Sequence, residues 1–172
     1  MSKEWNDTGI PLAYLITFRC YGTWLHGDER GSVDRLHNIY ETPFIPHSQN
    51  LNDYIVSNLK HEPVELDTKK RDVVENAIRE TCKIRNWGLL TINVRTNHVH
   101  VVVEVGAKPS SQVLIALKAN ATRQMREKGV WDFENTPWAD KGSKRRLWNE
   151  KDVEVAIDYV INGQGDDLPK FE

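Results

Sequence analysis

Two histidines separated by one residue, His98 and His100, open an apolar run rich in valine in this 172-residue chain. The run is short and β-branched, which predicts a buried strand over residues 98–105. Successive strand side chains point to opposite faces, so His98 and His100 share one face while Val99 points the other way. Two imidazoles held side by side on a rigid strand can begin a divalent metal site. The simpler alternative is two exposed histidines on a half-solvated strand.

A tyrosine near the C-terminus, Tyr159, is the second candidate for chemistry. It lies in a predicted helix but off the apolar stripe of that helix, on a face shared with Val155 and Asn162. Tyrosine has an ordinary pKa of about 10 and is a weak nucleophile. It becomes effective when a metal polarises the electrophile, for instance a phosphodiester, and when its proton has an acceptor. The alternative is a tyrosine at the edge of the core, with its ring packed against apolar residues and its hydroxyl exposed to solvent.

A basic segment at residues 141–146 precedes the tyrosine helix. The formal net charge of the chain is −2, so bulk charge does not indicate nucleic-acid binding. Between residues 108 and 146, however, nine basic residues stand against four acidic ones. A solvated loop without a ligand is the alternative to a DNA contact. The side chains expected to contact DNA from this loop are Lys141, Lys144, Arg145 and Arg146, with Trp138 stacking on an unpaired base.

The composition indicates one domain, spanning residues 1–172, with a real core. No run of roughly 18 to 20 apolar residues indicates a membrane span. The N-terminal residues lack the charged-then-apolar pattern of a signal peptide. Cys20 and Cys82 have neither zinc nor disulfide spacing and are expected to be buried. We therefore expect a soluble cytoplasmic protein without a membrane partner.

The order of predicted elements is strand, helix, strand, strand, helix, strand and a last helix. This order predicts an α+β, ferredoxin-like split β-α-β sandwich, an antiparallel sheet with helices on one face, plus a C-terminal helix that carries Tyr159. Residues 22–63 are expected to form a long irregular insertion, and residues 166–172 an acidic tail. The elements are a strand at 12–18, a helix that Asp67 caps, strands at 89–94 and 98–105, a helix that Ser110 or Ser111 caps, a strand at 146–148 and a helix that Asn149 caps.

Taken together, the His-x-His strand and the tyrosine helix about sixty residues later resemble the single-tyrosine HUH transposases, which include the REP-associated tyrosine transposases of bacteria. The resemblance extends over residues 12–164. Residues 14–19 are similar to the first strand of the family and residues 95–100 to its metal strand. Residues 146–148, before the tyrosine helix, are also similar. The two elements together are fairly specific, whereas either alone is not.

The resemblance implies a DNA strand transferase that acts on single-stranded DNA and bears His98 and His100 as metal ligands and Tyr159 as nucleophile. The implied cofactor is Mg²⁺ or Mn²⁺, and the implied product is a 5′-phosphotyrosine with a free 3′-OH. The family supplies a third ligand, Gln or Asn, at the fourth position after the tyrosine, where this chain has Gly163. Gln164 is the candidate by motif and Asn162 by helical geometry. A substrate with an adjacent hairpin and a homodimer are also implied; whether Tyr159 serves its own chain or a partner stays open.

Two rival functions remain open on the sequence alone. The first is a non-catalytic or domesticated regulator that binds DNA hairpins, which the glycine at position 163 favours. The second is a metal-dependent hydrolase or zinc site in which Tyr159 is merely structural. No third histidine, HExxH motif or carboxylate triplet stands at ligand spacing near His98, which counts against the second.

Overall fold

A computed structural model of the chain describes residues 8–23, 57 and 59–164. Most of the predicted insertion at residues 22–63 and the whole acidic tail at 166–172 lie outside the described residues. None of the helices in the described part combines the length and the apolar character that a bilayer span requires. The described elements are β1 (Ala13–Arg19), α2 (Thr68–Ile84), β2 (Gly88–Val94), β3 (His98–Glu104), α3 (Ser110–Glu127), β4 (Ser143–Leu147) and α4 (Glu150–Asn162).

The four strands form one antiparallel sheet in the order β2-β3-β1-β4. This order and the β-α-β-β-α-β succession confirm the predicted ferredoxin-like α+β fold. The two central strands are β1 and β3, and both are largely buried. Strand β3 is rich in valine, whose β-branched side chain suits a pleated surface. Because β3 begins at His98, the fold places the histidines inside the sheet rather than at its edge.

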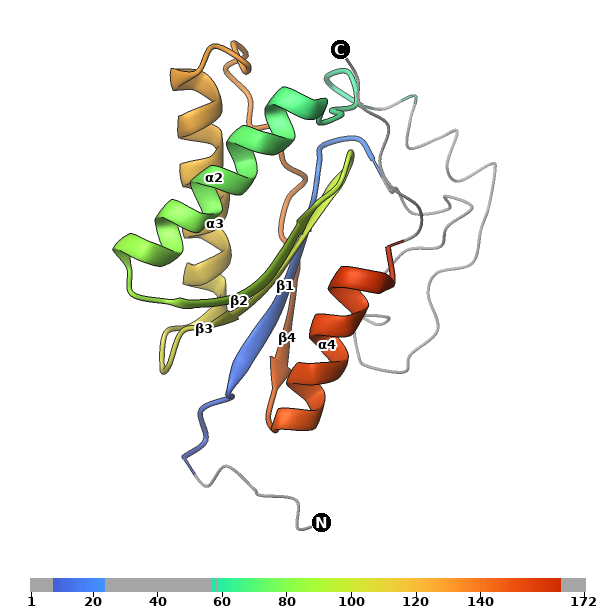
Figure 1. Cartoon of the computed structure of the whole chain (residues 1–172). Coiled ribbons are helices and arrows are strands. Elements are labelled where there is room, and N and C mark those ends of the chain that lie inside the picture. The colour runs from blue at the N-terminus through green and yellow to red at the C-terminus, as the bar shows by residue number, and fades with distance from the viewer. Residues whose placement is uncertain (1–7, 24–56, 58, 165–172) are drawn as a thin grey trace.

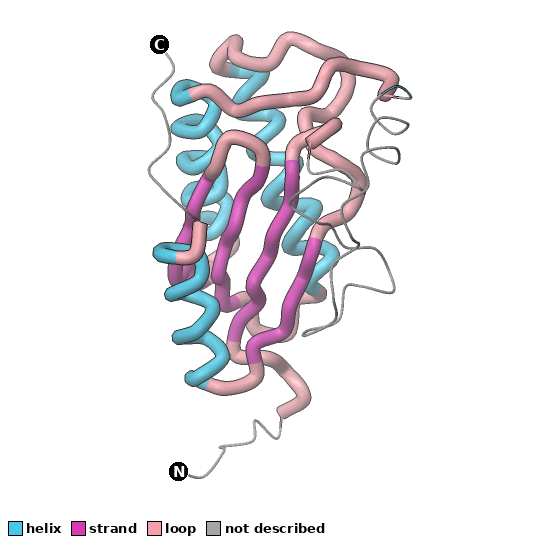
Figure 2. Tube along the Cα trace, turned by 90° about the vertical axis from the view of Figure 1, so that its right-hand side faces the viewer, coloured by secondary structure: helices cyan, strands magenta, loops and turns pink. Residues whose placement is uncertain are grey.

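The sheet separates two apolar cores. Figures 1 and 2 show the helices that cover its two faces. Helices α2 and α3 pack on one face, where alternate residues of β1 and β3 meet them. Helix α4 packs on the opposite face, so only two of these three helices share a side. The α4 side is the smaller core and consists of Ala13, Leu15, Val102, Leu147, Ala156 and Val160.

The predicted helix starts are confirmed in two cases and wrong in one. Asp67 accepts a hydrogen bond from the Lys70 amide at 2.9 Å, and Asn149 accepts one from the Asp152 amide at 2.9 Å. Helix α3, by contrast, has Pro109 as its N-cap and no side-chain cap. The reason is that Pro109 supplies the extended backbone turn, which places Ser110 inside the first helical turn.

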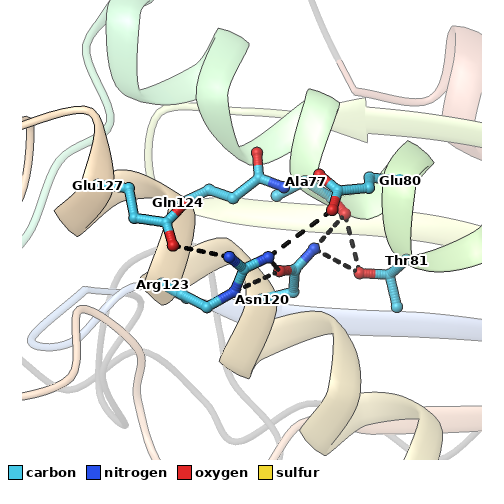
Figure 3. Close-up of polar contacts among 7 residues, drawn as sticks. All are labelled: Ala77, Glu80, Thr81, Asn120, Arg123, Gln124 and Glu127. Carbon is cyan, nitrogen blue, oxygen red and sulfur yellow. Dashed lines mark hydrogen bonds and ion pairs between the residues drawn. The ribbon is translucent and has the colours of Figure 1, made fainter. Parts of the chain in front are cut away.

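A polar network joins α2 to α3 on the face away from α4 (Figure 3). The Asn120 amide donates to the Ala77 carbonyl at 3.0 Å and to the Thr81 hydroxyl at 2.9 Å. Its oxygen accepts from Arg123, whose guanidinium also lies 3.7 Å from a Glu80 carboxylate oxygen. Since Asn120 uses both ends of its amide, this network sets the register of the two helices against each other.

Trp138 is a core residue of the α2–α3 face. Its side chain is 2% exposed, and its ring lies edge-on to Phe18 with centroids 4.9 Å apart. The indole N–H donates to the Thr122 hydroxyl at 3.1 Å and to the Lys118 carbonyl at 3.3 Å. Trp138 also forms an isolated bridge with Cys20, so it ties the segment before β4 to the end of β1.

We expect Trp138→Ala to lower the free energy of unfolding by about 3–5 kcal/mol, because it leaves a large cavity beside Phe18 and removes both hydrogen bonds of the indole N–H. Chemical denaturation followed by circular dichroism measures this change. The matched control is Trp148→Ala, since Trp148 is 41% exposed. The free energy of unfolding of Trp148→Ala should fall by less than half as much as that of Trp138→Ala. Equal decreases in the two variants would contradict the core assignment of Trp138.

Candidate active site

The two histidines lie side by side on the α4 face of the sheet, as the strand alternation predicted. Their ring centroids are 4.7 Å apart, with an angle of 78° between the ring planes. His100 stands in a cross-strand row, opposite Thr17 on β1 and Asn93 on β2. The side chain of His100 is only 1% exposed, whereas His98 is half-buried. The alternative of two exposed histidines is therefore wrong.

Both imidazoles are oriented through their Nδ1 atoms. The Nδ1 atom of His100 lies 2.7 Å from the Thr17 hydroxyl, and that of His98 lies 2.6 Å from the Asn97 side-chain oxygen. Among the described residues, the buried Nε2 atom of His100 has no hydrogen-bond partner. A buried polar atom without a partner is uncommon and points to a ligand or a function.

The His100 ring is neutral at neutral pH. Burial, followed by the neighbouring His98, lowers its pKa to about 3. A neutral imidazole carries one N–H and one lone pair. His100 can therefore offer a nitrogen lone pair without first losing a proton.

Helix α4 brings Tyr159 to the histidines of its own chain. The Tyr159 ring centroid lies 5.4 Å from that of His100, and the tyrosine side chain is 43% exposed. The helix is held on the sheet by Val160 in the small core and by the Asn93 amide, which donates to the Val160 carbonyl at 2.9 Å. Asn93 belongs to the same cross-strand row as His100, so one row of the sheet carries a histidine and anchors the tyrosine helix.

The chain turns back at the end of α4 and places Gln164 against His98. Gly163 is the C-cap, and its amide donates to the Tyr159 carbonyl at 2.9 Å. The Gln164 amide nitrogen donates to the same carbonyl at 3.0 Å, which leaves its oxygen 3.2 Å from the His98 Nε2 atom. Arg95 secures this turn by donating to the Gln164 carbonyl at 2.9 Å.

Gly163 is required by close packing at this turn. A Cβ atom there would lie 2.7 Å from the Tyr159 carbonyl oxygen and 2.9 Å from the Tyr159 ring. Any other residue would have to displace the tyrosine or open the turn. The glycine at position 163 thus has a structural reason, and the amide oxygen beside His98 comes from the next residue, Gln164.

Asn162, the other candidate ligand, points elsewhere. Its side-chain amide donates to the Asp158 carboxylate at 2.8 Å on the exposed side of α4. The structure therefore brings Gln164, and not Asn162, to the histidines. Helical geometry favoured Asn162, but α4 ends at that residue and Gly163 redirects the chain.

The arrangement fits a divalent cation. The Asn97 oxygen beside Nδ1 of His98 favours the tautomer that carries its hydrogen on Nδ1. In that tautomer the Nε2 lone pair faces the Gln164 oxygen, so two acceptors face each other. The His100 Nε2 atom adds a third donor. Two imidazole nitrogens and one amide oxygen suit Mn²⁺ better than Mg²⁺. Within the described residues no cluster of three or more His, Cys, Asp or Glu side chains can hold a metal. A metal at the two histidines would therefore need the side-chain amide oxygen of Gln164 as its third protein ligand.

The predicted DNA-contacting residues divide between the two faces of the sheet. Lys144, Arg145 and Arg146 lie in β4 and not in a loop, because the strand pairs with β1 from Ser143 onward; only Lys141 precedes it. The Arg145 position lies opposite Leu15 and shares the histidine face. Lys144 and Arg146 lie opposite Ile16 and Tyr14 and face the other way.

The expectation that Trp138 stacks on an unpaired base is wrong, because its ring is buried against Phe18.

Other residues at the site were not predicted from the sequence. Thr17, Asn93 and Arg95 contact the site from β1, β2 and the β2–β3 turn. Strand pairing reveals Thr17 and Asn93, and the β2–β3 turn places Arg95, since nothing in the local sequence of the three distinguishes them from other polar residues.

Comparison with solved structures shows a similar fold in a known protein. Among solved structures, a REP-associated tyrosine transposase bound to a REP hairpin is similar over 93% of this chain and 70% of its own, with 15% identity and a TM-score of 0.50, which supports the fold. A transposase candidate from Deinococcus radiodurans R1 is similar over 97% of this chain and 100% of its own, with 15% identity and a TM-score of 0.44. No curated protein sequence matches the chain.

A family model decides the classification. The model described as "Transposase IS200 like" matches residues 48–151, more than half of the chain. The matched segment contains the histidine strand and stops shortly before Tyr159, which lies in α4. The chain therefore belongs to the IS200-like transposase family.

Proposed function

We propose that this transposase-family chain nicks single-stranded DNA and transfers the strand through a covalent 5′-phosphotyrosine on Tyr159. The single observation that supports this most is the convergence of a tyrosine and three lone-pair donors on one side of the sheet. The Tyr159 and His100 rings lie 5.4 Å apart, and the Gln164 oxygen lies 3.2 Å from His98. A tyrosine with a merely structural role would not require that set of donors beside it.

The proposed ion is Mg²⁺ or Mn²⁺, held by the Nε2 atoms of His98 and His100 and the side-chain oxygen of Gln164. When bound, it would act as a Lewis acid on a phosphate oxygen. Asn97 and Thr17 orient the two imidazoles through Nδ1. Gly163 and Arg95 hold Gln164 in place by the turn and the hydrogen bond described above.

The proposed step is attack of the Tyr159 hydroxyl oxygen on a backbone phosphorus. An O–P bond to the tyrosine forms and the bond to the 3′ oxygen breaks, so the phosphate stays on the 5′ side. The tyrosine proton passes to solvent, which the half-exposed side chain permits, and the departing 3′ oxygen takes up a proton. Because no water is consumed, a free 3′-OH can reverse the step and join a different strand.

The proposed substrate is single-stranded DNA with an adjacent hairpin. A stiff duplex resists placement of a phosphate between a strand and a helix, whereas a single strand does not. The similar structure that was solved with a REP hairpin supports a hairpin substrate for this chain. The homodimer stays a proposal that the site does not require, because one chain carries both Tyr159 and the histidines.

For the nucleophile, we expect Tyr159→Phe to abolish the covalent DNA adduct while leaving DNA binding and folding nearly unchanged, since only a hydroxyl is removed. The measurement is denaturing electrophoresis after incubation with labelled single-stranded DNA and Mn²⁺. Tyr14→Phe is the matched control, because Tyr14 is buried on the opposite face. An adduct in the Tyr159→Phe variant would overturn the assignment. Wild-type binding without any adduct would favour the non-catalytic hairpin-binding alternative.

For the metal, we expect His98→Ala and His100→Ala each to weaken Mn²⁺ binding by more than about 100-fold and to eliminate cleavage. Calorimetric titration of Mn²⁺ into the protein measures the first effect without DNA. His61→Ala serves as the control, since the His61 ring packs against Tyr21, which borders the larger core on the other face of the sheet. Undiminished cleavage in both site variants at saturating Mn²⁺ would refute the metal assignment.

For the DNA path, we expect Arg145→Ala to reduce the salt dependence of single-stranded DNA binding by about 0.7 in slope, the loss of one phosphate contact. Arg146→Ala is the matched control, because Arg146 faces the other side of β4. Binding isotherms at several salt concentrations give the slopes. A larger change in the Arg146 variant would place the DNA on the opposite face of this strand.

A further inference from the structure

Thr17 is a side chain of β1 that contacts a histidine of the site. Its hydroxyl oxygen lies 2.7 Å from the Nδ1 atom of His100. The two residues are direct partners across the antiparallel pair of β1 and β3, so backbone pairing of the two central strands sets this contact. Thr17 was expected only as part of the first strand, with no role at the site.

The contact bears on which nitrogen of His100 carries the hydrogen. If Nδ1 carries it, Nδ1 donates to the Thr17 oxygen and Nε2 presents a lone pair. If Nε2 carries it, a buried N–H group is left where the described residues offer no hydrogen-bond partner. A buried donor without an acceptor is costly, so the geometry favours the Nδ1–H tautomer.

We infer that Thr17 is a positioning residue, which accepts the Nδ1 hydrogen bond of His100 and thereby presents Nε2 as the lone-pair donor for the ion. The inference rests on the proposed function, because only a ligand gives that lone pair a use. Thr17 acts through His100 and has no assigned contact with DNA. Asn97 holds the Nδ1 atom of His98 in the same way, at 2.6 Å. Both imidazoles are thus turned to offer the same atom, Nε2.

The first experiment measures the tautomer in the metal-free protein. Two-bond ¹H–¹⁵N correlation spectra distinguish Nδ1–H from Nε2–H histidine, and a His100→Gln sample assigns the signal. We expect Nδ1–H in the wild type and a shift toward Nε2–H in Thr17→Val, which keeps the β-branched shape and removes the oxygen. Thr17→Ser should keep the wild-type tautomer. A wild-type His100 found as Nε2–H would overturn the inference.

The second experiment measures Mn²⁺ affinity by calorimetry without DNA. Thr17→Val should bind about 10- to 100-fold more weakly than the wild type, whereas Thr17→Ser should stay close to it. Thr91→Val is the matched control, because Thr91 lies on the same face of the sheet but opposite Val102. It should bind Mn²⁺ like the wild type. Circular dichroism melting verifies that each variant is folded before titration.

The outcomes separate this inference from the proposed function. If His100→Ala loses Mn²⁺ binding and Thr17→Val does not, the metal site stands and the role of Thr17 is refuted. If His100→Ala binds Mn²⁺ as the wild type does, the metal assignment fails and the role of Thr17 fails with it. If Thr17→Val unfolds, the inference can still be refuted without that variant. An Nε2–H tautomer of His100 in the wild type or in Thr17→Ser would refute it.

Discussion

The antiparallel pairing of β3 with β1 and β2 is the constraint on which the rest of the site depends. It sets Asn93, His100 and Thr17 in one row across three strands. Asn93 binds the tyrosine helix and Thr17 binds the His100 ring, so a single row orients both kinds of catalytic candidate. A slip of one residue would turn this row to the opposite face and bury it against α2 and α3. The valines that alternate with the histidines prevent that slip, because they fill the larger core.

The two faces of the sheet differ in composition and in what they contribute to the protein. The face under α2 and α3 carries most of the apolar burial and the network around Asn120, and it holds the domain together. The α4 face has a small core and carries polar side chains toward one end of the strands. This division explains how His100 can be almost fully buried and yet unpartnered at Nε2 among the described residues. Stability is supplied elsewhere, so the cost of one unsatisfied nitrogen is tolerated.

The last turn of α4 converts a helix end into part of the site. The Tyr159 carbonyl accepts from both the Gly163 amide and the Gln164 side chain, so the orphan carbonyl of the helix end is used to orient a candidate ligand. Gly163 makes this possible because no Cβ atom fits beside Tyr159. The positions of Tyr159 and Gln164 are therefore linked. A disturbance of the turn would move both residues, and one alone could not be repositioned without the other.

Local sequence patterns determined a large part of this protein. Strand alternation placed His98 and His100 on one face, short polar residues at positions 67 and 149 marked two helix starts, and an off-stripe position marked Tyr159. These features depend on residues close together in the chain, whose geometry is set by the helical or strand repeat. The element order then indicated the ferredoxin-like fold, which the sheet order confirms.

Tertiary structure alone decided the contacts between distant segments. The choice of Gln164 over Asn162 depends on where α4 ends and on the space beside Tyr159. The burial of Trp138 depends on Phe18, 120 residues earlier, and the side that Arg145 takes depends on its pairing with β1. The partnership of Thr17 with His100 is a matter of register between strands separated by more than eighty residues. No local pattern encodes such a register, because it is selected by the packing of the whole sheet against its helices.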